Sequence, residues 1–204
     1  MTSPVEILLA TGNPDKGAEM ARLLGGLPLI LRTRADFPDL PEVVEDADTF
    51  AGNAIKKAAE LSAATGMLAL GDDSGLCVDA LDGAPGVYSA RYAGEDCSYA
   101  DNNAKLVAAL KDTAEAERSA HFVCVVAIVG PNLAPVTFEG TCDGLITEAP
   151  EGAAGFGYDP VFLIPENGRT FGQMTVDEKA RISHRARAFA QARAWLSKYL
   201  DTGS

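Results

Sequence analysis

Short apolar segments of two kinds alternate along this chain of 204 residues, and this alternation constrains the fold more than any single motif does. Residues 6–10 and 29–31 are short apolar runs typical of buried strands, whereas residues 15–24 and 49–65 place apolar side chains on one helical face. Strands that alternate with helices form sheets covered by helices. We therefore expect an α/β fold with a mixed sheet.

The second half of the chain continues this pattern and adds a hairpin. Ser98 and Asp101 have the spacing of a capping box, which predicts a helix that starts there. Residues 121–129 and 136–146 read as two strands, and the turn residues 130–132 between them predict an antiparallel pair.

Two adjacent carboxylates, Asp72 and Asp73, lie in the segment Gly-Asp-Asp-Ser-Gly between two strand-like apolar runs. Side chains alternate in direction along extended backbone, so we expect the two carboxylates to face different ways, with one of them beside Ser74 in a cleft. One interpretation is a polar turn that separates two strands. The other is a Mg²⁺-binding or general-base site. The segment alone does not decide between them.

A candidate phosphate site follows the first strand. Residues 11–16, Thr-Gly-Asn-Pro-Asp-Lys, form a turn that leads into a helix, where backbone N–H groups and the helix dipole favour anions. Lys16 adds a full positive charge, but the segment matches neither common phosphate-loop pattern and also suits an ordinary strand–helix connection. Lys57 lies on an otherwise apolar helix face, where a lysine either reaches solvent or extends into a cleft.

Two further segments carry candidate recognition residues. A glycine-rich loop, residues 152–159, holds Phe156 and Tyr158, whose rings either stack on a planar ligand or cover the edge of the core. His184 and Arg185 lie in the first turn of the predicted last helix, after the cap residue Ser183. A cation is unfavourable at that end of a helix, so Arg185 is expected to have an anionic or hydrogen-bonding partner.

Composition excludes several classes of function. The net charge of −12 argues against nucleic-acid binding and requires that any anionic ligand be held by local cations or a metal ion. No apolar run approaches the roughly 20 residues that span a bilayer, so no membrane association is expected. The four cysteines form no CxxC pair, which favours thiols in a reducing cytoplasm.

Six motifs occur here in one order from about Ile7 to Leu196: TGNPDK, TF..NA..KA, DDSGL, GAPG.YSARY, GFGYDP.F and EK...SHR.RA. Together they resemble the inosine triphosphatase, or XTP/dITP diphosphatase, family. Two departures are Gly52, where the helix motif commonly has Glu, and Gly71, which replaces a frequent Ala before the Asp pair.

The resemblance implies a single two-lobed domain over residues 1–204, with an elongated mixed β-sheet, flanking helices and a nucleotide cleft between the lobes. It implies a cytoplasmic homodimer that uses Mg²⁺ to hydrolyse the purine nucleoside triphosphates ITP, dITP and XTP to the monophosphate and pyrophosphate, and so cleanses the nucleotide pool. The alternatives are a pyrimidine-preferring pyrophosphatase of related fold and a nucleotide sensor without catalysis.

The resemblance also assigns site residues. Asp73 matches the proton acceptor, and Glu45 and Asp73 match the Mg²⁺ ligands. Arg185 or His184 is expected to donate to the 6-keto oxygen of the base, with Phe156 stacked on the ring. The positions that match substrate-binding residues are Thr11, Gly12, Asn13, Pro14, Asp15, Lys16, Lys57, Ser74, Phe156, Gly157, Tyr158, Asp159, Lys179, His184 and Arg185.

Overall fold

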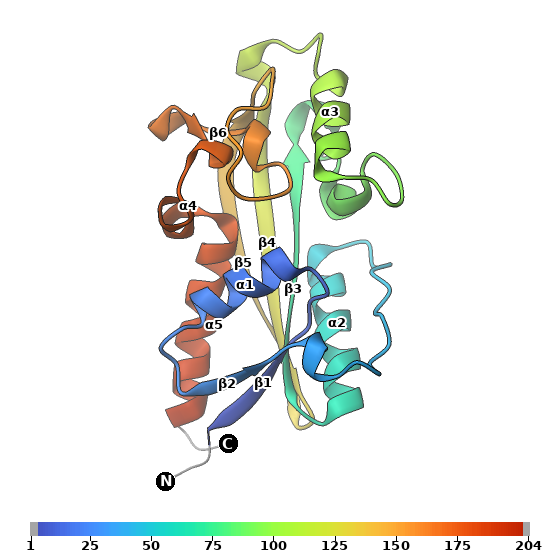
Figure 1. Ribbon diagram of the computed structural model, residues 1–204, viewed down its shortest axis with the longest axis vertical. Coiled ribbons are helices and arrows are strands. Elements are labelled where there is room, and N and C mark those ends of the chain that lie inside the picture. The colour runs from blue at the N-terminus through green and yellow to red at the C-terminus, as the bar shows by residue number, and fades with distance from the viewer. Residues whose placement is uncertain (1–3, 202–204) are drawn as a thin grey trace. The chain divides into compact units, whose positions relative to one another are not determined.

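The structure, a computed structural model, describes residues 4–201 and contains a seven-stranded sheet in the order β2-β1-β3-β4-β5-β6-β7 (Figure 1). Its strands are β1 (Val5–Leu9), β2 (Leu29–Arg32), β3 (Leu68–Val78), β4 (Ser119–Gly130), β5 (Leu133–Ile146), β6 (Phe162–Ile164) and β7 (Arg169–Thr170). Its α-helices are α1 (Pro14–Leu23), α2 (Phe50–Thr65), α3 (Tyr99–Ala109), α4 (Val176–Ile182) and α5 (His184–Asp201).

The sheet is mixed, as expected from the sequence. Strand β1 pairs in parallel with both β2 and β3, whereas β6 pairs antiparallel with β5 and with β7. Neighbouring strands β4 and β5 are joined by the two-residue turn 131–132, a connection that only antiparallel strands allow. The predicted hairpin is therefore confirmed, although β5 begins three residues earlier than expected, at Leu133.

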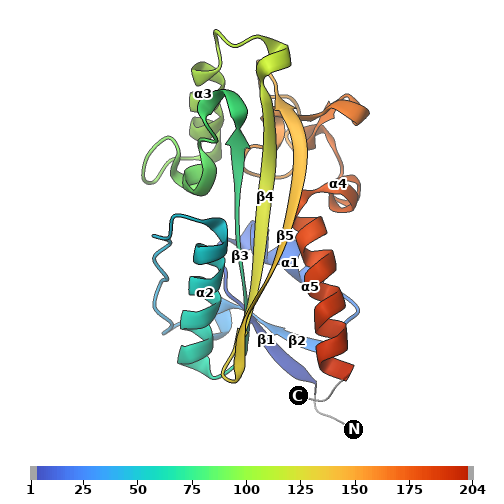
Figure 2. The ribbon, with the colours of Figure 1, turned by 180° about the vertical axis from the view of Figure 1, so that it is seen from behind.

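Internal contacts divide the chain into two compact units. The first unit comprises the described residues up to Asp73, then Cys124–Gly140, and then residues 185–201; the second comprises Ser74–Val123 and Thr141–His184. The long strands β3, β4 and β5, which Figure 2 shows from behind, each contribute residues to both units.

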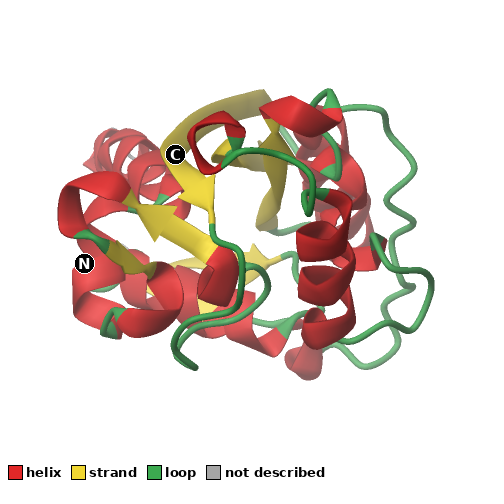
Figure 3. Ribbon diagram, turned by 90° about the horizontal axis from the view of Figure 1, so that it is seen from above, coloured by secondary structure: helices red, strands yellow, loops and turns green. Residues whose placement is uncertain are grey.

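Each unit has its own apolar core. In the first, residues of β1, β3 and β4 pack with α1 and with the face of α5 that carries Phe189, Ala192 and Leu196. In the second, the ring of Phe122 lies 4.6 Å from that of Phe162, and Phe162 lies 5.2 Å from Phe171, measured between centroids. Figure 3 distinguishes the helices that flank the sheet from the loops that connect them.

The helix signals of the sequence correspond to real helix ends. Thr49 caps α2 by accepting a hydrogen bond from the Gly52 amide at 3.0 Å, and Gly66 ends the helix in the left-handed region with a φ of 70°. The box of Ser98 and Asp101 opens α3, and α5 begins at His184 as predicted. None of the helices within residues 4–201 is both long and apolar enough to cross a membrane.

The interpretation of residues 71–75 as a turn between two strands is wrong. Strand β3 runs through the segment without interruption from Leu68 to Val78. Gly71 serves a different purpose there, because a Cβ at this position would lie 2.6 Å from the carbonyl oxygen of Ala54 in α2. The glycine therefore lets a helix approach the strand closely at the point where the two aspartates follow.

Candidate active site

The segment 11–16 is held by its own side chains. The Asn13 side chain accepts hydrogen bonds from the backbone N–H groups of Asp15, at 2.9 Å, and of Lys16, at 3.2 Å, and so caps α1. The backbone N–H of Asn13 in turn donates to Thr11 Oγ1 at 3.2 Å. Pro14 occupies the first helical position, where a missing N–H costs nothing. The turn thus presents Lys16 from a fixed helix start.

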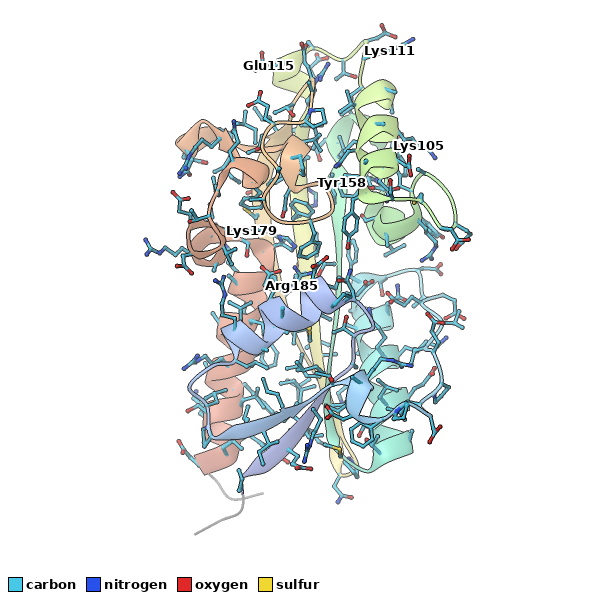
Figure 4. All side chains as sticks on the ribbon, in the orientation of Figure 1. Lys105, Lys111, Glu115, Tyr158, Lys179 and Arg185 are labelled. Atoms are coloured by element: carbon cyan, nitrogen blue, oxygen red, sulfur yellow. The ribbon has the colours of Figure 1, made fainter. Side chains whose placement is uncertain are left out.

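Asp72 points into a buried group of charges in the first unit. Its Oδ2 accepts from Arg185 Nε at 3.2 Å and Nη2 at 3.1 Å, and lies 3.8 Å from Lys16 Nζ. Arg185 Nη1 donates to Glu19 of α1 at 2.8 Å. The expectation that Arg185, labelled in Figure 4, has an anionic partner is confirmed, and it has two, Asp72 and Glu19.

The guanidinium of Arg185 is enclosed by protein, with 2% of the side chain exposed. Burial lowers its pKa, but the charges of Asp72 and Glu19 and the hydrogen bonds to Asp72 more than offset that effect, so the pKa is raised overall. Arg185 therefore carries its charge at every ordinary pH, and it compensates the fully buried Asp72 and the partly buried Glu19.

Asp73 has a different set of partners, as alternation along a strand requires. It accepts from Asn53 Nδ2 at 3.1 Å, and its Oδ1 lies 3.5 Å from Lys57 Nζ. Lys57 Nζ also lies 2.9 Å from Glu45 Oε2. Asn53 and Lys57 are one turn apart on α2, so one helix face reaches this carboxylate with both an amide and an ammonium.

Burial and neighbouring charges shift the pKa values of both Asp73 and Lys57. Burial raises the pKa of Asp73, an effect that Lys57 and Lys16 partly reverse and that Glu45 reinforces. Burial lowers the pKa of Lys57, but Asp73, Asp72 and Glu45 outweigh it, and the net pKa is raised. Lys57 thus stays cationic beside an aspartate that binds a proton more readily than a free one.

The donor set fits a magnesium ion. Glu45 and Asp73, the two expected ligands, both contact the ammonium of Lys57, so a cation already lies between them. Mg²⁺ typically takes one or two carboxylates and completes its shell with phosphates and waters. Within residues 4–201, no group of three or more His, Cys, Asp or Glu forms a metal site from protein ligands alone. Any magnesium here would depend on substrate oxygens.

The glycine-rich loop of the second unit is built around Asp159. This buried carboxylate accepts from the backbone amide of Phe156 at 2.9 Å and from Lys179 Nζ at 2.5 Å. Lys179 Nζ lies 4.9 Å from the centroid of the Phe156 ring, within the range of a cation–π contact. Gly155, with a φ of 76°, lies so close to Asp159 that a Cβ there would be 1.9 Å from the carboxylate.

The two aromatic residues of this loop have different environments. Phe156 is half-buried, so stacking on a planar ligand remains the interpretation for its ring. Tyr158 is 4% exposed and belongs to the core, and its hydroxyl donates to the carbonyl of Ser89 at 2.9 Å. Stacking by Tyr158 is therefore wrong, and the alternative that its ring covers the core is confirmed. Burial also raises the pKa of Tyr158, so its hydroxyl stays protonated.

His184 is buried as well, and its ring stacks on Phe122 with 4.5 Å between centroids and 11° between planes. Ser74 follows Asp73 directly on β3 and is half-buried in the second unit.

The predicted residues thus fall into two groups. Lys16, Glu45, Lys57, Asp73 and Arg185 gather with Asp72 in the first unit. Phe156, Asp159 and Lys179, the last labelled with Tyr158 in Figure 4, gather in the second.

Sequence reasoning missed four polar residues that hold these groups: Glu19, Asn53, Ser89 and Asn103. Glu19 was detectable, because it follows Lys16 by three residues on the same helix and Arg185 required an anion. Asn53 follows the Thr49 cap by one turn and precedes Lys57 by another. Ser89 and Asn103 act across long sequence separations, and no local signal marked them.

Comparison with known proteins gives consistent results. The model of the Ham1 family matches residues 7–195. A dITP/XTP pyrophosphatase of Geobacter sulfurreducens is 49% identical over 184 residues, which are 90% of this chain and 92% of that protein. A dITP/XTP pyrophosphatase of Geobacillus kaustophilus is 47% identical over 186 residues, 91% of each chain.

Solved structures show the same fold. A HAM1 protein from Coxiella burnetii superposes with a TM-score of 0.88 at 40% identity, covering 95% of this chain and 99% of the other. A nucleoside-triphosphatase / dITP/XTP pyrophosphatase from Mycobacterium abscessus superposes with a TM-score of 0.75 at 42% identity, covering 92% of this chain and 97% of the other.

Proposed function

Because this chain belongs to the Ham1 family, we propose that it is a nucleoside triphosphate pyrophosphatase that hydrolyses dITP, ITP and XTP to the monophosphate and pyrophosphate. The observation that carries the proposal is the contact of Lys57 with both Glu45 and Asp73, beside a lysine-bearing helix start. Such a group matches the needs of a triphosphate, which requires several positive charges and a site for a hard cation.

Binding of the triphosphate is assigned to the first unit. Lys16 and Lys57 supply two ammonium groups, and the capped segment from Thr11 to Lys16 supplies the positive end of α1. Mg²⁺, when bound by Glu45 and Asp73, would neutralise the charge that develops on the departing pyrophosphate. This role for the metal explains why two carboxylates lie in a site for an anionic substrate.

Asp73 is our choice for the proton acceptor. Its carboxylate orients a water molecule towards the α-phosphorus and takes a proton from it, and the Asn53 amide fixes the carboxylate in place. Asp72, which the sequence left as the alternative proton acceptor, accepts two hydrogen bonds from Arg185 at its Oδ2 and so serves as the partner of that guanidinium instead.

Recognition of the base is assigned mainly to the second unit. Hypoxanthine and xanthine carry a 6-keto acceptor and an N1–H donor where adenine has the reverse pattern, so a site matched to one pattern leaves buried polar groups unpaired with the other. Phe156 stacks on the purine ring, and Lys179 lies beside the Phe156 side chain. His184 is the candidate donor to the 6-keto oxygen. Arg185, engaged with Asp72 and Glu19, supports the acidic group instead.

We also propose a cytoplasmic homodimer. None of the four cysteines forms a disulfide, which suits a reducing compartment. The homodimer rests on the family resemblance alone, and light scattering coupled to size-exclusion chromatography tests it.

The decisive experiment is a product assay on dITP, XTP, dGTP, ATP and dTTP that resolves pyrophosphate from orthophosphate, with Mg²⁺ and with a chelator. We expect monophosphate and pyrophosphate mainly from dITP and XTP, and only with Mg²⁺. Orthophosphate as the product would refute attack at the α-phosphorus. Preference for dTTP would favour a pyrimidine enzyme, and binding without turnover would favour a sensor.

Variants assign the proton acceptor in the same assay. Asp73→Asn keeps the shape of the side chain but is a poor base, so turnover should fall by a factor of about 10² or more while the fold is retained. Asp39→Asn, an exposed position in the loop before α2, is the matched control and should leave turnover unchanged. A near-normal rate for Asp73→Asn would overturn the assignment.

A further inference from the structure

Helix α3 contacts the glycine-rich loop of the second unit through a buried amide. Asn103 is 5% exposed, and its Nδ2 donates to the backbone carbonyl of Gly157 at 3.0 Å. Gly157 immediately follows Phe156, so this bond acts on the peptide next to the stacking ring. The two residues are 54 positions apart, so the bond joins α3 to a segment that is distant in the sequence.

The orientation of the Asn103 amide is dictated by its partner. A carbonyl oxygen accepts only from a donor, so the NH₂ end must face Gly157. The other end, Oδ1, is buried and makes no hydrogen bond within residues 4–201. A half-satisfied buried amide is unusual in a core, and an apolar side chain would avoid it. The hydrogen bond from Asn103 to Gly157 of the loop therefore explains the amide better than packing in the core does.

A second contact comes from the same face of α3. Tyr99 lies one turn before Asn103, and residues four apart share a helix face. Its ring lies 6.1 Å from that of Phe156 between centroids, at 39° between planes, which is the range of an aromatic pair. Tyr99 and Asn103 thus hold the ring and the following peptide of the loop from one side.

The helix is itself firmly placed. Its N-terminus is closed by the box of Ser98 and Asp101. Asn102 donates to the Ala90 carbonyl at 3.1 Å and accepts from the Ala93 amide at 2.7 Å. Lys105, labelled in Figure 4, donates to the Tyr92 carbonyl of the same segment. One face of α3 is therefore anchored to residues 90–93, while Tyr99 and Asn103 face the loop.

We propose that Tyr99 and Asn103 of α3 are positioning residues that set the place of Phe156 for stacking on the purine base. The inference rests on the proposed function and adds a second support to the loop. Asp159 and Lys179 hold Phe156 from within its own segment and from α4. Gly155 and Gly157, with φ values of 76° and 64°, flank Phe156 in the left-handed region that glycine adopts readily.

The kinetic test replaces the amide by an apolar side chain of similar size. Asn103→Leu should raise KM for dITP about tenfold, the order expected from one lost hydrogen bond, and should leave kcat within about twofold. The phosphate-binding residues belong to the first unit and are untouched. Tyr99→Leu, at a position 41% exposed where folding is tolerant, should raise KM about threefold.

The matched control is Asn102→Leu. Asn102 is the same residue type on the same helix and equally buried, but it bonds to residues 90–93. Because Asn102 anchors α3 as a whole, its replacement should lower thermal stability and raise KM for dITP clearly less than the Asn103 variant does. Equal rises in KM for the Asn102 and Asn103 variants would reduce both to general structural roles and overturn the proposal.

Hydrogen exchange provides a readout that needs no turnover. In Asn103→Leu without nucleotide, amides of residues 155–159 should exchange at least tenfold faster, while those of β4 stay unchanged. Asn103→Ala, which removes the donor without adding bulk or charge, serves if the leucine variant fails to fold. Unchanged exchange in the loop overturns the proposal whether or not dITP is a substrate. Faster exchange with no turnover by the unmodified protein would instead count against the proposed function alone.

Discussion

Replacement of Arg185 by alanine should destabilise the first unit severely. The side chain is 2% exposed and bonds to Asp72, which is fully buried, and to Glu19, which is 11% exposed. Alanine would remove the one guanidinium that both carboxylates share. Lys16 would remain near Asp72, but at 3.8 Å it makes a weaker contact than the bonds of 3.1 and 3.2 Å that are lost.

The magnitude follows from the burial of the pair. Breaking a buried ion pair by removal of one partner costs about 3–5 kcal/mol, because the other charge stays buried without compensation. For a chain of this size, each kcal/mol lowers the melting temperature by about 2–4 °C. We therefore expect a melting temperature lower by about 6–20 °C.

The assay is thermal unfolding at pH 7, monitored by far-UV circular dichroism, together with urea unfolding. Arg185→Lys keeps one charge but loses the fork that reaches both carboxylates, and it should fall between the parent and the alanine variant. Arg187→Ala, two residues further along α5 and exposed, is the control and should stay within about 0.5 kcal/mol of the parent.

The refuting result is specific. If Arg185→Ala melts within about 2 °C of the parent and loses its preference for dITP over dATP, the guanidinium acts on the base and not on the carboxylates. A large loss of stability with the preference retained supports the role proposed here.

Two further predictions follow from glycine packing and from a surface carboxylate. Gly71→Ala brings a Cβ within 2.6 Å of the Ala54 carbonyl oxygen, so it should lower the free energy of unfolding by about 1–3 kcal/mol and displace α2. Gly17→Ala, whose Cβ would meet only Thr11 at 3.6 Å, should raise the free energy of unfolding by about 0.5–1 kcal/mol. Urea unfolding measures both, and equal effects would refute the packing argument. Hydrogen bonds from Arg169 and from the Thr175 amide and hydroxyl lower the pKa of Glu178 from 4.5 to about 2. A carboxyl whose pKa is lowered by folding stabilises the fold above its unfolded pKa, and this contribution is lost as the pH falls from 4.5 to about 2. Glu178→Gln should therefore make the free energy of unfolding depend less on pH in that window. An unaltered dependence on pH would contradict the assignment.

Much of the fold was predictable because its signals are local. Periodicity, the Thr49 cap and the Gly66 stop defined α2, and the turn at 131–132 defined the hairpin of β4 and β5. The turn interpretation of residues 71–75 stayed open because glycine and aspartate favour turns locally, while the close approach of α2 that requires Gly71 is a tertiary contact.

The candidate site was predictable by residue type and less so by role. The need of Arg185 for an anion followed from its place at a helix start, but the identity of Glu19 and Asp72 as partners depended on how helix and strand meet. Similarly, the sequence offered two interpretations for Tyr158, and only its burial in the core of the second unit separates it from Phe156.

The division of strands between the two units has a consequence for biosynthesis. A ribosome releases the chain from its N-terminus, and N-terminal domains usually fold first. The first unit departs from that order, because Phe189, Ala192 and Leu196 of α5 complete the core around Leu9 and Leu70. The residues of β1 and β3 therefore keep an apolar face uncovered until α5 emerges. Arg185, which compensates Asp72, belongs to the same helix, so the apolar core and the charge compensation of this unit are completed together when α5 emerges.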